Sequence, residues 1–153
     1  MQNNRNYLIT GATGRVGKRV AEQLLSQGHQ ARVFGRNRER LQPLVDMGAT
    51  PFASDMWDKE SVDEAFRGID AVLLIAQGDR SSRDYRRDFV RAGENYAAAL
   101  ASHEVKWAVF ISTHGTDDDR NPGVLLTERS PMSPSTFATR SKTSFVMSWH
   151  QPF

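Results

Sequence analysis

Three spaced glycines follow directly on the first apolar run of the chain. The run is Tyr7-Leu8-Ile9-Thr10, and the glycines stand at positions 11, 14 and 17. Residues 15–27 then carry apolar side chains at steps of three and four, which is the spacing of an amphipathic helix. A short buried strand therefore passes into a helix through a glycine turn, and this connection is typical of the first unit of an α/β fold.

The same alternation of strand and helix continues for about two thirds of the chain. The expected strands are 7–10, 30–34, 50–53, 71–76 and 107–111, and the expected helices are 15–27, 38–47, 59–67 and 84–103. Strands joined through helices form a parallel sheet that is covered on both faces. Right-handed crossovers that start at the centre give the strand order 3-2-1-4-5. The sequence therefore predicts a Rossmann-type doubly wound parallel sheet with five strands.

The periodic pattern stops near Gly115. The following residues are rich in serine, threonine and proline, with prolines at positions 122, 131, 134 and 152. We expect a domain over 1–115 and an irregular tail over 116–153, a remnant of or substitute for a substrate lobe. Within this tail, residues 135–149 hold either a short helix or a strand, and the pattern does not choose between them.

The glycine turn has the spacing of a dinucleotide-binding turn. Gly11 allows the chain to leave the strand sharply, Gly14 lets a diphosphate approach the backbone, and Gly17 lets the helix pack tightly on the sheet. The amides at the helix start then face the phosphates. The alternative is a tight turn without a ligand. The residues predicted to hold the diphosphate are Gly11, Thr13, Gly14, Arg15, Val16 and Gly17.

The residue at the end of the second strand distinguishes the two nicotinamide cofactors. An acidic residue there binds the ribose hydroxyls of NAD, but this chain has Gly35-Arg36. An arginine fork pairs with the 2′-phosphate of NADP. The sequence therefore favours NADP(H) over NAD(H), with Arg36 as the phosphate ligand; otherwise Arg36 is a solvated side chain like Arg38 and Arg40.

Two further segments belong to the edge where ligands bind in such sheets. Asp55 and Met56 follow the third strand, and Ala76 and Gln77 end the fourth. Asp55 either accepts a hydrogen bond from the adenine amino group or is a helix cap or a solvated carboxylate. Ala76 and Gln77 either let the cofactor ribose pass or form an ordinary turn.

The remaining composition argues against several other classes of protein. The net charge is +2 and no basic stripe is interleaved with aromatic residues, so a nucleic-acid partner is not expected. No apolar run approaches the roughly 20 residues that span a bilayer, and the polar N-terminus lacks a signal-like core, so a cytoplasmic protein is the simplest interpretation. There is no cysteine, and the four histidines lack metal-ligand spacing.

Taken in order, these motifs resemble the atypical short-chain dehydrogenase/reductases, specifically the NmrA-like, NAD(P)H-binding group. The resemblance implies a Rossmann fold, NADP(H) preference, and either quinone-type reduction or redox sensing. It implies cofactor contacts from Gly11, Thr13, Gly14, Arg15, Val16, Arg36, Asp55, Ala76 and Gln77. The motifs that carry it, over residues 7–115, are Thr10–Gly17, Phe34–Asn37, Gly48-Ala49 with Ser54–Met56, Gly68–Val72 and Val109–Thr113.

The chain departs from this family at three points. Ser54 stands where the family usually has glycine. None of its tyrosines, Tyr7, Tyr85 and Tyr96, has the lysine four residues later that classical members use for proton transfer. Family members also continue into a sixth strand and a substrate lobe, so we expect a truncated or frame-shifted relative.

No catalytic residue is identified from the sequence. Ser112 and His114, at the end of the fifth strand, either donate to a substrate carbonyl or form a strand-end turn. Three functions stay open: an NADPH-dependent reductase of a small electrophile such as a quinone, a non-catalytic NADP(H) sensor, and an inactive relative.

Overall fold

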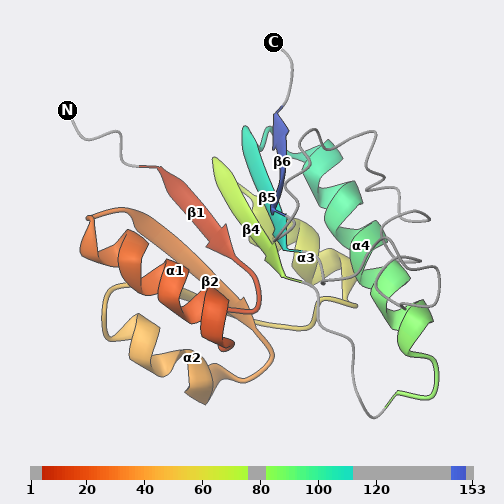
Figure 1. Ribbon diagram of the computed structural model, residues 1–153, viewed down its shortest axis with the longest axis horizontal. Helices are drawn as coiled ribbons and strands as arrows, with labels where there is room; N and C mark the ends of the chain where they lie inside the picture. Colours follow the sequence, from red (N-terminus) through yellow and green to blue (C-terminus); the bar gives the residue numbers. More distant parts are fainter. Residues whose placement is uncertain (1–4, 76–81, 112–145, 151–153) are drawn as a thin grey trace.

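The computed structural model describes residues 5–75, 82–111 and 146–150 and arranges them as one sheet between two pairs of helices (Figure 1). The parallel strands are β1 (Asn6–Ile9), β2 (Gln30–Gly35), β3 (Thr50–Ala53), β4 (Ala71–Ile75) and β5 (Trp107–Ile111). The helices are α1 (Arg15–Ser26), α2 (Arg38–Val45), α3 (Lys59–Phe66) and α4 (Tyr85–Ser102). The predicted Rossmann-type order 3-2-1-4-5 is confirmed.

A sixth strand extends this sheet beyond β5. β6 (Val146–His150) pairs antiparallel with β5, so that Trp107 lies opposite His150 and Ile111 lies opposite Val146. It overlaps the end of the stretch 135–149, for which the sequence left helix and strand open, and it resolves that choice as a strand for 146–149. The rest of the predicted tail, residues 116–145 and 151–153, lies outside the described residues.

The apolar residues of the central strands alternate between two cores, one on each face of the sheet. Leu8 and Leu74 point into the core beneath α3 and α4, whereas their neighbours Ile9 and Leu73 point into the core beneath α1 and α2. The side chains of Leu8 and Leu74 are completely buried. Central parallel strands that are buried on both faces require continuous apolar runs, and this explains the uninterrupted sequence of β4.

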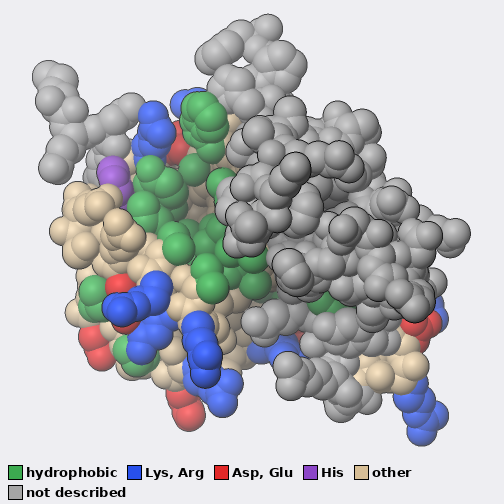
Figure 2. Space-filling model, in the orientation of Figure 1, with side chains coloured by type: hydrophobic (Ala, Val, Ile, Leu, Met, Phe, Trp, Pro, Cys, Tyr) green, Lys and Arg blue, Asp and Glu red, His purple; other side chains and the backbone are tan. Residues whose placement is uncertain are grey.

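The core beneath α1 and α2 is the more open of the two. These helices contact β1, β2 and β3, so apolar side chains farther along the sheet, such as Val109 and Ile111, stay partly exposed. In the space-filling view, hydrophobic side chains gather in the middle of the visible face, beside residues that are not described (Figure 2).

The helix starts differ in a way that bears on ligand binding. The side chain of Asn37 caps α2, that of Asp58 caps α3, and that of Asp84 caps α4, each by accepting a backbone N–H of the first turn. The hydrogen bonds from Ser61 also lower the pKa of the Asp58 carboxyl. Among the four described helices, only α1, whose N-cap is Gly14, begins without a side-chain cap.

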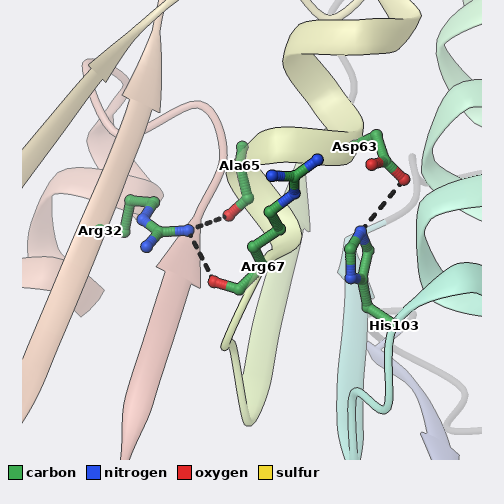
Figure 3. Close-up of polar contacts among 5 residues, drawn as sticks. All are labelled: Arg32, Asp63, Ala65, Arg67 and His103. Atoms are coloured by element: carbon green, nitrogen blue, oxygen red, sulfur yellow. Dashed lines mark hydrogen bonds and ion pairs between the residues drawn. The ribbon is translucent and has the colours of Figure 1, made fainter.

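The end of α3 is held by an arginine from the sheet. Arg32 of β2 directs its Nη1 to the carbonyl oxygens of Ala65, at 2.6 Å, and Arg67, at 3.0 Å (Figure 3). A cation at this position satisfies carbonyls that the helix leaves unpaired, and burial lowers the pKa of Arg32. On its other side α3 is tied to the end of α4, where Nε2 of His103 lies 3.0 Å from Oδ1 of Asp63 (Figure 3).

Replacing Arg32 with methionine should lower the free energy of unfolding by about 1–2 kcal/mol, because two helix-end carbonyls lose a charged donor. Urea denaturation measures this change. Arg67→Ala is the matched control, since it removes a guanidinium but keeps the backbone carbonyl that Arg32 binds. Equal losses in the two variants would contradict the proposed capping role of Arg32.

Candidate cofactor site at the carboxyl edge of the sheet

The predicted glycine turn connects β1 to α1. Gly11 has a φ of +60°, in the left-handed region that other residues rarely adopt. A Cβ at this position would also lie 3.1 Å from the Cβ of Ile75 in β4. The positive φ and the close approach of Ile75 therefore both favour glycine at the point where the chain leaves the sheet.

Gly17 is required for a different reason. It is buried in the first turns of α1, and a Cβ there would overlap the carbonyl oxygen of Gly11 and lie 2.9 Å from its carbonyl carbon. The same Cβ would lie 3.0 Å from the Cα of Ala12. The missing side chain thus lets the helix rest directly on the turn that precedes it, whereas the sequence predicts that Gly17 allows close packing on the sheet.

Within the described residues, no side chain caps the backbone amides at the start of α1. The first N–H groups of a helix have no partner within the helix, and no side chain takes this place at Gly14. The side chains of Thr13 and Arg15 are exposed, and that of Val16 is 50% exposed. This end of the helix, with its partial positive charge, has the properties of an anion-binding site.

Arg36 lies at the end of β2, next to this turn. The preceding Gly35 is buried, and a Cβ at that position would lie 3.4 Å from Cγ2 of Thr13, so strand and turn are close neighbours. The Arg36 guanidinium carbon lies 5.6 Å from the centre of the Trp57 ring, within the range of a cation–π contact. Of the ion pairs found among the described residues, none involves Arg36.

The loop after β3 is fixed by hydrogen bonds along its length. Ser54 donates its N–H to the Gly35 carbonyl at 3.2 Å, and Oδ1 of Asp55 accepts the N–H of Trp57 at 3.1 Å. The indole Nε1 of Trp57 donates to the backbone carbonyl of Asp88 in α4 at 2.9 Å. Asp55 therefore shapes its own loop, which is held beside Arg36.

Met56 has a structural position within this loop. Its side chain is 9% exposed and belongs to the core beneath α3 and α4. Its carbonyl accepts a hydrogen bond of 2.9 Å from Nδ2 of the buried Asn95 in α4. The side chain of Met56 thus packs in the core and its carbonyl is hydrogen-bonded to Asn95. Its backbone N–H is the group of Met56 that is left to contact a ligand.

Thr10 joins β1 to β4 immediately below the turn. Its buried hydroxyl accepts the N–H of Ile75 at 2.7 Å and lies within hydrogen-bond distance of the Leu73 and Ile75 carbonyls. Nearby, the Tyr96 side chain of α4 is buried against Phe66, and burial raises the pKa of its hydroxyl. This hydroxyl lies near that of Thr10, but it makes no hydrogen bond of adequate distance and angle with a described residue.

Replacing Tyr96 with phenylalanine should leave the free energy of unfolding unchanged or raise it by up to about 1 kcal/mol, because an unpaired buried hydroxyl carries a desolvation cost. Urea denaturation is the measurement. Tyr96→Leu is the comparison, and it should be destabilising because the ring contact with Phe66 is lost. A clear loss of stability in the phenylalanine variant would mean that the hydroxyl has a partner.

The structure brings together most of the predicted site residues, at the edge where the parallel strands end. The glycine turn, Arg36 and the Asp55 loop follow β1, β2 and β3, which are adjacent in the sheet. Ala76, Gln77, Ser112 and His114 lie outside the described residues. Sequence reasoning missed Trp57 and Asn95; an aromatic side chain in the loop and an amide on the apolar side of a helix were the available signals.

The described part of the chain offers no metal-ligand cluster and no membrane-spanning helix. Residues 5–75, 82–111 and 146–150 contain no group of three or more histidine, aspartate or glutamate side chains placed to hold a metal ion. None of their helices has the length and apolar character needed to cross a bilayer.

Comparison with known proteins agrees with this geometry. Residues 11–146 match the model of an NAD(P)H-binding family. A sterol-4-alpha-carboxylate 3-dehydrogenase (decarboxylating) from Dictyostelium discoideum is 30% identical over 118 residues, which are 72% of this chain and 36% of that protein. A 4-hydroxy-2-methyl-3-oxo-4-farnesyl-3,4-dihydroquinoline-1-oxide ketoreductase from Stigmatella aurantiaca is 28% identical over 134 residues, which are 85% of this chain and 40% of that protein.

A solved structure shows the same fold. Triphenylmethane reductase from Citrobacter sp., in complex with NADP(H), superposes with a TM-score of 0.65 at 22% identity, over 79% of this chain and 43% of the reductase. This chain thus spans less than half the length of these relatives. The glycine turn, the sheet order and the match over residues 11–146 lead to one conclusion: the chain belongs to the NAD(P)H-binding family.

Proposed function

We propose that this chain binds NADP(H) in preference to NAD(H) and forms the cofactor-binding part of a reductase for a small electrophile such as a quinone. In this proposal the diphosphate lies against the start of α1, the 2′-phosphate pairs with Arg36, and the adenine lies near the Asp55 loop. The residues that hold the cofactor are Gly11, Thr13, Gly14, Arg15, Val16, Gly17, Arg36, Asp55, Met56, Ala76 and Gln77.

The uncapped start of α1 is the observation that carries cofactor binding. The other three described helices satisfy a first-turn amide with their own Asn or Asp side chain, whereas the start of α1 leaves its amides to an external anion. Selection of NADP rests on Arg36, which stands where a carboxylate would favour NAD. A guanidinium without a carboxylate partner among the described residues keeps its charge for a phosphate.

The choice of a reductase follows from the cofactor and from the relatives. Bound NADPH supplies a hydride, while the protein binds and orients the cofactor. The relatives include a ketoreductase named for a 3-oxo-dihydroquinoline oxide and a triphenylmethane reductase. A quinone, like a ketone, is an electrophilic carbonyl compound that can accept a hydride.

A non-catalytic NADP(H) sensor is the second candidate, and the two tyrosines whose side chains the structure describes favour it. The Tyr96 side chain is completely enclosed in the core, and the half-buried Tyr7 lies in the first half of β1, away from the carboxyl edge. Neither has a lysine four residues later, and neither is placed to give a proton to a substrate at that edge.

Two measurements on the purified chain test this proposal. Saturating NADPH should raise the melting temperature more than NADH does, because a ligand that binds only the folded state stabilises it. NADPH oxidation, followed by absorbance against a panel of quinones, then separates the two candidates: turnover supports a reductase, and tight binding without turnover supports a sensor. If neither cofactor shifts the melting temperature, the proposed function is wrong.

A further inference from the structure

The loop between β3 and α3 places the ring of Trp57 beside Arg36, the residue predicted to bind the 2′-phosphate. The Trp57 side chain is partly buried against the core beneath α3 and α4. Its indole Nε1 donates to the Asp88 carbonyl at 2.9 Å, and its backbone N–H donates to Oδ1 of Asp55 at 3.1 Å. The ring is therefore held at its edge by α4 and at its backbone by its own loop, and its orientation is set before any ligand arrives.

Arg36 lies over the face of this ring. Its guanidinium carbon is 5.6 Å from the ring centre, and its side chain is otherwise exposed. A cation–π contact attracts the charge without using any N–H donor of the guanidinium. A carboxylate in the same place would neutralise the charge and occupy two donors. The tryptophan face therefore holds the arginine while its planar fork stays available for a phosphate.

We infer that Trp57 is a positioning and specificity-determining residue, which holds Arg36 in the geometry that recognises the 2′-phosphate of NADP(H). This inference rests on the proposed function and adds to it the residue through which Arg36 acts. Restricting the arginine in advance reduces the entropy that is lost when it pairs with a phosphate. NAD(H) lacks the 2′-phosphate, so Trp57 should influence the binding of NADP(H) selectively.

The test is the ratio of the dissociation constants for NAD⁺ and NADP⁺, measured by calorimetry. Trp57→Leu should lower this ratio about two- to five-fold, the range of one partly exposed cation–π contact, with little change for NAD⁺. Trp57→Phe keeps a weaker aromatic face and a filled core position, so it should give an intermediate ratio and does not depend on the leucine variant folding. A purely structural role of Trp57 would weaken both cofactors alike and leave the ratio unchanged.

Two controls complete the experiment. Trp107→Leu removes a tryptophan from the first residue of β5, at the amino end of the parallel strands and thus opposite the candidate site, and should not change the ratio. In the background of Arg36→Ala, Trp57→Leu should have no further effect on the ratio, because the group it positions is gone. If the wild-type chain prefers NADP⁺ but both Trp57 variants keep the same ratio, this inference is wrong while the proposed function stands. A wild-type chain that binds neither cofactor overturns it together with the proposed function.

Discussion

Replacing Gly17 with alanine should lower the free energy of unfolding by about 3 kcal/mol, because the added methyl group meets backbone atoms that cannot move independently. The new Cβ would overlap the carbonyl oxygen of Gly11 and lie 3.0 Å from the Cα of Ala12. At a solvent-exposed position inside a helix, the same change would raise the free energy of unfolding by about 1 kcal/mol. A loss of stability would therefore show that the added methyl group meets the turn. Urea denaturation measures the loss, and the melting-temperature shift caused by NADPH should shrink because the turn is displaced.

Gly48→Ala is the matched control for this prediction. Gly48 has a φ of +102°, but a Cβ there would meet no atom within 4 Å. Alanine at this position therefore suffers backbone strain alone, which costs about 1 kcal/mol, and the NADPH-induced shift should be kept. If Gly17→Ala is no more destabilising than this control, then α1 does not pack on the turn as described.

Replacing Arg36 with alanine should weaken the binding of NADP⁺ about 10- to 100-fold, the range expected for losing charge-assisted hydrogen bonds to a phosphate. The binding of NAD⁺ should change less than about two-fold, because it has no 2′-phosphate to lose. Calorimetric titration with the two cofactors measures both constants. The difference between wild type and variant should also decrease at high salt, as the exposed charge is screened.

Arg38→Ala provides the comparison for Arg36. Arg38 is exposed in the first turn of α2, two residues farther along, and carries the same charge. If positive charge alone attracted NADP⁺, both variants would lose the same amount of NADP⁺ affinity. If Arg36 contacts the 2′-phosphate specifically, only Arg36→Ala loses the preference for NADP⁺ over NAD⁺. Equal effects would assign the preference to net charge and not to Arg36.

Local patterns in the chain determine most of the fold. The apolar run of β4 and the three- and four-residue spacing of α1 each depend on neighbouring residues, so they could be recognised without knowledge of contacts. The glycines at 11 and 17 indicated the turn because few backbone conformations require glycine. The structure gives Gly11 a positive φ and leaves no room for a side chain at Gly17. The strand order then follows from right-handed connections.

β6 could not be placed in this way. Its pairing partner, β5, lies more than thirty residues earlier, and the segment between them has no periodic pattern that would direct one strand to the other. Such a strand is stabilised by hydrogen bonds to a strand that is distant in the sequence. The residues of the segment itself do not indicate which strand that is. The antiparallel direction is likewise a property of the assembled sheet.

For the candidate site, the sequence by itself determined which residues stand at the strand ends: the glycine turn, Arg36 and Asp55. Only the tertiary structure decided how they are supported, since the contacts of Trp57 with Arg36 and Asp88, and of Asn95 with Met56, join segments that are far apart in the chain. The physical reason is that a strand end is set by local backbone preference, whereas the partner of a side chain is set by which elements the fold packs side by side.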